Sequence, residues 1–457
     1  MAESGSPRFT PQQIRGLAVV WIGVMILVAI CTFLGIWWAL SRDKDDASQV
    51  RGGGEIQPPT VPPAAGVATP VQATPQGAEG EGILPAAPTP TVPPRQDPSF
   101  GYGIQAQLHM DTRRTLDMIE QLGMNWVKQQ VRWADLEPAQ GAANWDALDK
   151  IFSRIAERPV GPRVMISIVD APDWARSVTA EGKAGPPDDT QTFVSYVTQM
   201  VQRYPGQIHA IEVWNEQNLD REWYTAGGLS AAGYVQMLAA IEQAVHAIDP
   251  NIIIISGALS PTGWDDGVSA IDDFRYMQMM IDAGLLDHTD CVGVHHNGIN
   301  LPPDQSAEDA YASGMPPGTV FSGPYDTGNP LNPHHSWSFY STLNGYHDMI
   351  VAAGRDTPLC VTEFGWASME GLPAGDPRAG FEFAWDNSLE EQAAYVTQAF
   401  TLMHDWDFVW LAFLWNLDFS PKAGGDPSND NVAYSILKPD GSPRPAFDAL
   451  RDMPKLP

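Results

Sequence analysis

Eight short apolar runs recur between residues 99 and 457, and they alternate with segments that have helical patterns. Strands of a parallel sheet that is buried on both faces have such near-continuous apolar sequences. Eight alternating units predict an α/β domain folded as a (β/α)8 barrel, or TIM barrel, rather than as a doubly wound sheet. The runs are 100–105, 126–131, 163–169, 208–214, 252–256, 291–296, 359–363 and 409–415.

The N-terminal part of the chain differs in composition from this domain. Residues 16–40 carry no charge and are mostly apolar. The stretch is longer than the roughly 20 residues that cross a bilayer, and it is too long for the apolar core of a signal peptide. The charged segment 41–46 follows it in place of a small-residue cleavage pattern. We therefore expect a transmembrane anchor at 16–40.

The orientation of this anchor depends on its flanks. Basic residues on its two sides nearly balance, so the positive-inside rule gives little direction. Long domains are translocated largely regardless of charge, and a short N-terminus usually stays inside. We expect residues 1–15 in the cytoplasm and the large domain outside, which predicts a single-pass protein of the cell membrane with an extracytoplasmic domain.

Residues 41–98 form the connection between anchor and domain. Pro, Ala, Thr and Gly dominate this segment. Such a composition cannot bury a core, and it favours extended polyproline conformations. At about 3.1 Å per residue, the segment would be a spacer on the order of 100 Å long.

The charge and the cysteines limit the possible partners and cofactors. The chain has a formal net charge of −29, whereas nucleic acids and anionic membrane surfaces require basic patches. We expect no nucleic-acid partner and a neutral ligand. Of the three cysteines, Cys31 lies in the predicted anchor, and Cys291 and Cys360 lie in predicted strands. Two buried thiols are the default there, with a disulfide left open. No zinc-type cysteine spacing is present.

Two of the apolar runs end in a glutamate beside an amide or an aromatic residue. They are Val213-Trp-Asn-Glu-Gln-Asn218 and Val361-Thr-Glu-Phe-Gly-Trp366. Parallel barrels carry catalytic groups at the C-terminal ends of their strands. Cleavage of a glycosidic bond with retention needs two carboxyl groups, one to protonate the leaving oxygen and one to attack the anomeric carbon. The pair Glu216 and Glu363 therefore predicts a retaining glycosidase.

These motifs resemble those of the clan of retaining glycoside hydrolases that share a (β/α)8 barrel. Trp-Asn-Glu at 214–216 is similar to the clan's acid/base motif, and Thr-Glu-Phe-Gly at 362–365 to its nucleophile motif. The segment 132–138 resembles the clan's second-strand segment, and the segment 439–446 its usual ending. The similarity spans about 105–450 and is greatest for glycoside hydrolase family 39, with families 5 and 10 as close competitors. It implies a poly- or oligosaccharide substrate and no cofactor.

The resemblance assigns a role to individual residues, and each role has a physical reason. Glu216 as acid/base needs a raised pKa, which nearby aromatic residues such as Trp174 or Trp223 could supply by burial. Glu363 as nucleophile must stay ionised, and the strand-end Arg132 is the expected cation; a salt bridge at the barrel rim is the alternative for this arginine. Asn215 could donate to the sugar 2-hydroxyl.

The eighth and sixth predicted strands supply the remaining candidate residues. Trp415 stands where the clan has the tryptophan that floors the sugar site. The clan's sixth strand usually reads His-x-Tyr, whereas this chain has His295-His296-Asn297. Strand alternation puts His295 and Asn297 on one face, so Asn297 replaces the tyrosine. Either Asn297 supplies the hydrogen bond to the nucleophile, or a residue such as Tyr325 or Tyr340 does.

Two alternatives to a glycosidase are a metal-dependent protein and a non-catalytic glycan-binding protein. His334 and His335 lie in a loop without a spaced carboxylate partner, and the adjacent His295 and His296 face opposite ways, so we expect no metal site. A non-catalytic glycan-binding protein on a glycosidase-like barrel is the main alternative, because a fold does not fix a function. The joint presence of the two glutamates, the amide and the strand-end arginine favours the enzyme.

Overall fold

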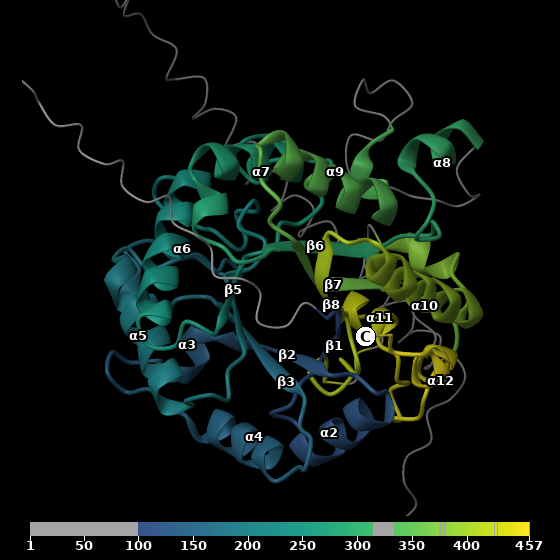
Figure 1. Cartoon of the computed structure of the whole chain (residues 1–457), viewed down its shortest axis with the longest axis horizontal. Coiled ribbons are helices and arrows are strands. Elements are labelled where there is room, and N and C mark those ends of the chain that lie inside the picture. The colour runs from purple at the N-terminus through teal and green to yellow at the C-terminus, as the bar shows by residue number, and fades with distance from the viewer. Residues whose placement is uncertain are drawn as a thin grey trace, which may run out of the picture. The chain divides into compact units, whose positions relative to one another are not determined.

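A ring of parallel strands with helices around it forms the described part of the chain (Figure 1). The computed structural model describes residues 99–313, 333–373, 377, 381–424, 426 and 428–456, all in one compact unit. Each predicted apolar run contains one strand, which confirms the predicted parallel (β/α)8 arrangement. The strands are β1 (Gly101–Gln105), β2 (Trp126–Arg132), β3 (Arg163–Val169), β4 (Ala210–Val213), β5 (Ile253–Ser256), β6 (Val292–Gly298), β7 (Leu359–Trp366) and β8 (Val409–Leu414).

At least one helix follows every strand, as a (β/α)8 barrel requires. Most of these helices begin with a side-chain cap; Ser388, for example, forms a capping box with Glu391 at the start of α10. The α-helices are α2 (Thr112–Gln121), α3 (Trp133–Leu136), α4 (Asp146–Ala156), α5 (Thr190–Arg203), α6 (Ala231–His246), α7 (Asp273–Asp282), α8 (Ala307–Ser313), α9 (Phe339–Ala352), α10 (Leu389–Asp405), α11 (Asp430–Tyr434) and α12 (Pro445–Asp452).

The predictions for the N-terminal part of the chain concern residues that the structure does not describe. The short N-terminus at 1–15, the anchor at 16–40 and the linker at 41–98 all lie outside the described residues. Within the described ranges, the structure contains no helix with the length and apolarity needed to cross a membrane.

The strands are ordered β5-β4-β3-β2-β1-β8-β7-β6 within the sheet. The remaining gap, between β5 and β6, is joined by isolated parallel bridges from Ile255 to Cys291 and from Leu259 to Val294. The backbone N–H of Ser256 also donates to the carbonyl of Cys291 at 3.2 Å. These contacts close the ring and bring the ends of β4 and β7 to the same end of the barrel.

Of the strand boundaries that differ from those predicted, the ends of β4 and β7 bear on the site. β4 ends at Val213 because Trp214 has a φ of 80°, in the left-handed region that an extended strand cannot include. β7 instead continues to Trp366, so Glu363 lies within the strand rather than at its end.

Strand alternation divides the buried residues into two sets. In β7, Leu359 and Val361 pack in the large core shared with the helices, whereas Cys360 belongs to a separate buried cluster inside the barrel. There Cys360 forms a disulfide with Cys291, at an S–S distance of 2.11 Å. The default expectation of two free thiols is therefore wrong. Parallel pairing of neighbouring strands holds the two Cα atoms 5.7 Å apart, within the range that a disulfide spans.

Candidate active site

A cleft of about 1160 Å³ is lined by residues at the C-terminal ends of the strands. An opening at this end is where (β/α)8 barrels carry their ligand sites. Six of the eight predicted site residues line the cleft, namely Arg132, Asn215, Glu216, Asn297, Glu363 and Trp415. The barrel therefore brings together side chains that lie far apart in the sequence.

Glu216 enters this cleft through a local change in backbone conformation. It follows the end of β4 and has a φ of 46°; Trp214 before it and Asp170 after β3 also have positive φ. Such values are uncommon for residues other than glycine, and they occur most often at functional sites, where surrounding contacts hold them in place. The turn ends the strand and leaves the Glu216 carboxyl among the residues that line the cleft.

Two basic side chains contact the Glu216 carboxylate. Arg221 donates from Nη2 to Oε2, and His295 Nδ1 lies 3.3 Å from Oε1. Burial alone would raise the pKa of this carboxyl, but the Arg221 charge and the His295 contact outweigh it and lower the pKa to about 2. The sequence-based expectation of a raised pKa is therefore wrong for this arrangement. The ion pair with Arg221 is the reason, because it offsets the desolvation that burial imposes.

Glu363 has a different counterion from the one expected. Its Oε1 lies 3.1 Å from the Nζ of Lys128, a residue of β2 that is fully buried. Lys128 Nζ also lies 2.9 Å from Oε2 of Glu212, which is buried in β4. Burial lowers a lysine's pKa, but the carboxylates of Glu212 and Glu363 prevail and raise the pKa of Lys128. A charged lysine inside the barrel thus faces the expected nucleophile.

Arg132 instead takes the alternative role of a salt bridge at the barrel rim. Its guanidinium donates to Asp170, with Nε 3.1 Å from Oδ2, and Nη1 lies 3.3 Å from Oδ1 of Asp135. About half of the Arg132 side chain, 52%, is exposed. The arginine therefore lines the cleft as a partly exposed wall residue. Lys128, rather than Arg132, pairs with Glu363.

His295 connects the two candidate catalytic carboxylates. The ring is buried, and its Nδ1 lies 3.3 Å from Glu216 while its Nε2 lies 3.8 Å from Glu363 and 3.9 Å from Glu212. Burial lowers the pKa of this imidazole, but the carboxylates of Glu363 and Glu216 prevail and raise it. His295, Lys128 and Arg221 thus lie among the three carboxylates of Glu212, Glu216 and Glu363.

Asn215 and Asn297 both present an oxygen that lacks a partner. Asn215 Oδ1 and Asn297 Oδ1 are buried, and neither accepts a hydrogen bond from any residue in the described part of the chain. Unpaired buried polar atoms are rare, so such atoms at a cleft indicate a place where ligand hydroxyls bind. An amide oxygen accepts rather than donates, so these two atoms suit sugar O–H groups.

The structure places the two predicted aromatic site residues differently: Trp415 lines the cleft and Trp174 does not. Trp415 is joined to Asn416 by a cis peptide bond. Its ring centroid lies 5.7 Å from that of Phe419. Trp174 packs edge-on against Trp133 at 5.5 Å, and its indole donates to the carbonyl of Glu137. Trp174 and Trp223 are not among the residues that line the cleft, and Trp223 packs edge-on against Trp214 with ring centroids 5.7 Å apart.

Of the two tyrosines considered as replacements for the clan's sixth-strand tyrosine, the structure describes one. Tyr340 on α9 packs edge-on against the Trp406 ring at 5.8 Å and is absent from the lining of the cleft. Tyr325 lies outside the described residues. A tyrosine that the sequence did not single out, Tyr434 of α11, lines the cleft with its hydroxyl 3.5 Å from the carbonyl of Gly298.

Four charged residues of the site were missed from the sequence. Lys128 and Glu212 are charged residues within apolar strand runs, and such residues are almost never fully buried unless paired. That pattern was a usable signal. Arg221 and Glu222 follow the acid/base motif by a few residues, and their sequence carries no comparable signal. Glu222 lines the cleft, and burial and the charge of Glu216 raise its pKa to about 7.

Comparisons with known proteins show the fold. No family model and no curated protein matches the chain. Among solved structures, a family 39 glycoside hydrolase from Bacteroides cellulosilyticus WH2 aligns with a TM-score of 0.54 at 19% identity, covering 78% of this chain and 63% of that one. This chain thus spans less than two thirds of that protein's length.

Two further solved structures have the same architecture. A monomeric β-xylosidase from Caulobacter crescentus CB15 aligns with a TM-score of 0.51 at 16% identity, covering 78% of this chain and 68% of that one. A glucosidase from Croceicoccus marinus aligns with a TM-score of 0.51 at 14% identity, covering 77% and 66%. The structural neighbours are glycoside hydrolases, so the resemblance seen in the motifs is confirmed at the level of the (β/α)8 fold.

Proposed function

We propose that this protein is a retaining glycoside hydrolase that cleaves O-glycosidic bonds of a poly- or oligosaccharide. One observation carries the proposal: the carboxylates of Glu216 and Glu363, which both line the cleft, contact opposite nitrogens of the same buried imidazole, His295. Retaining chemistry requires two carboxyl groups about 5–5.5 Å apart on either side of the scissile bond. A shared histidine is consistent with such a close pair.

The reaction would proceed in two displacements. Glu363 attacks the anomeric carbon, and the bond to the leaving oxygen breaks as Glu216 transfers a proton to that oxygen. A water molecule then gives its proton to Glu216 and attacks the same carbon, and the ester bond to Glu363 breaks. Lys128 holds its buried charge 3.1 Å from the Glu363 carboxylate, where it pairs with the attacking group.

The ion pair between Arg221 and Glu216 determines when the acid can act. In the pair, Glu216 is ionised and cannot donate a proton. The Arg221 side chain is 53% exposed, so it can turn away when a sugar enters the cleft. Without that charge, burial becomes the larger influence on Glu216 and raises its pKa, as a general acid requires. Substrate entry would therefore couple to protonation of Glu216.

The same ion pair favours the second candidate, a glycan-binding protein without turnover. A permanently ionised Glu216 would hold sugar hydroxyls but could not assist a leaving group. The proposal and this alternative predict different behaviour when the carboxylates are removed.

The deciding experiment uses the purified full chain with Glu363→Ala. Turnover of an activated aryl-glycoside should be lost while oligosaccharide binding persists, because the change removes the nucleophile and little of the binding surface. Added azide should restore some cleavage with inverted product. Glu390→Ala, an exposed carboxyl on α10, is the matched control and should behave like the parent. If Glu363→Ala equals the parent on every glycoside tested, the glycan-binding alternative replaces the enzyme.

We further propose that the domain acts outside the cytoplasm on a single-pass anchor at 16–40. The uncharged sequence of this segment supports the anchor. The disulfide between Cys291 and Cys360 supports the location, since disulfides persist in oxidising compartments and are rare in the cytosol. Protease treatment of intact cells should release the barrel domain. Protection in intact cells, together with cleavage in lysates, would reverse the orientation.

A further inference from the structure

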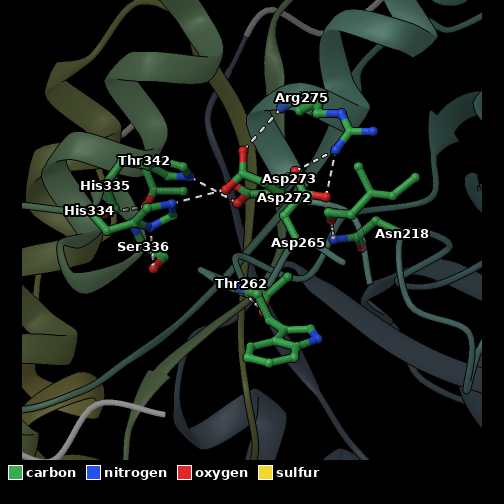
Figure 2. Close-up of polar contacts among 12 residues, drawn as sticks. Asn218, Thr262, Asp265, Asp272, Asp273, Arg275, His334, His335, Ser336 and Thr342 are labelled. Carbon is green, nitrogen blue, oxygen red and sulfur yellow. Dashed lines mark hydrogen bonds and ion pairs between the residues drawn. The ribbon is translucent and has the colours of Figure 1, made fainter. Parts of the chain in front are cut away.

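Two adjacent histidines and two adjacent aspartates meet on the outside of the barrel. Asp272 is the N-cap of α7, and Asp273 is the first residue of that helix. His334 and His335 lie at the short 3₁₀-helix η3 (His335–Trp337), just before α9. Figure 2 shows the imidazoles and carboxylates turned toward one another across the gap between these segments. The carboxylate partners that the loop sequence lacks are thus supplied by a helix about sixty residues upstream.

Three of these side chains form a set that fits a metal ion. One ligand atom each from Asp272, His334 and His335 lies within 4.8 Å of the others. His334 Nε2 is 3.0 Å from Asp272 Oδ2. Atoms bound to one tetrahedral Zn²⁺ at about 2.0–2.2 Å lie roughly 3.3 Å apart, so small side-chain rotations would close the set. Two imidazoles and one carboxylate suit a borderline divalent transition metal.

Each imidazole also has an outer partner that fixes its orientation. His335 Nε2 lies 2.9 Å from Asp273 Oδ1, and the other oxygen of this buried aspartate accepts from the Tyr346 hydroxyl at 2.7 Å. His334 Nδ1 lies 2.8 Å from Ser336 Oγ. Histidines that bind metals almost always have such a carboxylate or hydroxyl contact on the second nitrogen. On the other side of the His334 ring, Nε2 faces Asp272 Oδ2 at 3.0 Å, while Nδ1 also accepts from the backbone N–H of Ser336 at 3.3 Å.

Two separate ion pairs, one for each histidine, would be the simpler explanation of the cluster. In that case one N–H of each ring donates to its aspartate. The ring centroids of His334 and His335 lie 4.2 Å apart, and Phe274 stacks on the His335 ring with its centroid 3.5 Å away. A metal ion would instead bind one ring nitrogen of each histidine together with Asp272, so a metal titration distinguishes the two arrangements.

We propose that Asp272, His334 and His335 bind one divalent transition-metal ion of the Zn²⁺ class, with water in the fourth position. The side chains of the three ligands are 7–18% exposed, so water reaches the site. Ser336 and Trp337, which follow directly, line the cleft. The ion would fix this part of the cleft wall to α7. The site is separate from Glu216 and Glu363 and does not depend on the glycosidase proposal.

The test measures metal binding rather than activity. The full chain in detergent is treated with a chelator, dialysed, and titrated with ZnCl₂ by calorimetry; Co²⁺ is added in parallel to record its tetrahedral absorption bands. We expect one Zn²⁺ per chain and a higher unfolding midpoint with Zn²⁺ than without it. His334→Ala and Asp272→Asn should each weaken binding about 100-fold or more, and Ser336→Ala about tenfold.

The controls separate metal loss from loss of structure. His404→Ala removes a histidine on α10 that also pairs with a carboxylate, and it should bind Zn²⁺ like the parent. Each variant's metal-free unfolding midpoint is compared with that of the metal-free parent. If the parent binds no Zn²⁺ or Co²⁺, or if the double variant His334→Ala/His335→Ala still binds one equivalent, the proposal is overturned. Loss of binding in a ligand variant that keeps the metal-free midpoint supports it.

Discussion

Lys128 and Glu363 form an ion pair inside the barrel, Nζ to Oε1 at 3.1 Å, although they are 235 residues apart in the sequence. Lys128 is fully buried and also pairs with Glu212 at 2.9 Å. One lysine thus pairs with two carboxylates, one that is fully buried and one that lines the cleft. The counterion of the proposed nucleophile therefore comes from within the barrel rather than from a side chain at the rim.

The first prediction concerns this lysine. Lys128→Met should lower the free energy of unfolding by about 3–5 kcal/mol, because it leaves buried carboxylates without a counterion. It should also lower kcat/KM roughly 100-fold or more, since the positive charge beside the attacking carboxylate is lost. Urea unfolding and aryl-glycoside kinetics measure the two effects.

A second change separates the structural effect from the catalytic one. Lys128→Met/Glu212→Gln removes one of the two unpaired carboxylates, and it should recover part of the stability without recovering activity. Lys150→Met, an exposed lysine on α4, should leave both quantities unchanged. Full activity in a stable Lys128→Met variant would contradict the role of Lys128 beside Glu363.

The comparison of sequence and structure explains which of these features could be foreseen. Strand and helix bounds followed from local patterns, because a buried parallel strand leaves a continuous apolar run; α4 and β3 begin and end where the sequence predicted. The two glutamates of the cleft, Glu216 after β4 and Glu363 within β7, were also visible in the sequence. Ion-pair partners were not, because tertiary packing selects them, and the neighbour of Glu363 comes from β2 rather than from the visible Arg132.

Pairings between distant segments could not be predicted from the sequence either. Cys291 and Cys360 were placed in strands, but nothing in the sequence fixed the register that brings their Cα atoms 5.7 Å apart. His334 and His335 were noticed as a pair, yet their carboxylate partners come from α7. In each case the residue type was visible and the neighbour was not.

The second prediction is a shift in pH dependence. A general acid must be protonated to act, so kcat/KM falls as pH rises through its pKa. Arg221→Gln removes the ionic contact that, more than any other, lowers the pKa of Glu216, so this pKa should rise. The alkaline limb of the kcat/KM profile should move roughly one to three units to higher pH.

The matched control for this shift is another arginine in an ion pair. Arg203→Gln breaks a pair with Asp149 outside the cleft and should leave the profile in place. An alkaline limb that stays at the same pH in Arg221→Gln would mean that Glu216 is not the proton donor.

The third prediction concerns the disulfide inside the barrel. Replacing both cysteines, Cys291→Ala/Cys360→Ala, should lower the free energy of unfolding by about 2–5 kcal/mol, because the bond restricts the unfolded chain. Urea unfolding of the full chain under non-reducing conditions measures this change. Denatured parent should titrate with one free thiol, Cys31, without reductant and with three after reduction. Three free thiols without reductant would contradict the pairing.

The fourth prediction links Glu222 to stability. Burial and the charge of Glu216 raise the pKa of Glu222 from 4.5 to about 7. A carboxyl with a raised folded-state pKa contributes stability that is fully present below the unfolded value and is lost as pH rises through the folded value. Between pH 4.5 and about 7 the parent should therefore lose up to about 3 kcal/mol from this group.

Glu222→Gln cannot ionise and should not show this loss. Its free energy of unfolding, relative to that of the parent, should rise across the same pH window and stay level above it, because the parent alone must keep a buried negative charge beside Glu216. Urea unfolding of both proteins at a series of pH values gives the difference curve. Glu390→Gln on α10 should give a flat curve. A flat curve for Glu222→Gln as well would mean that Glu222 stays solvated and does not carry the raised pKa.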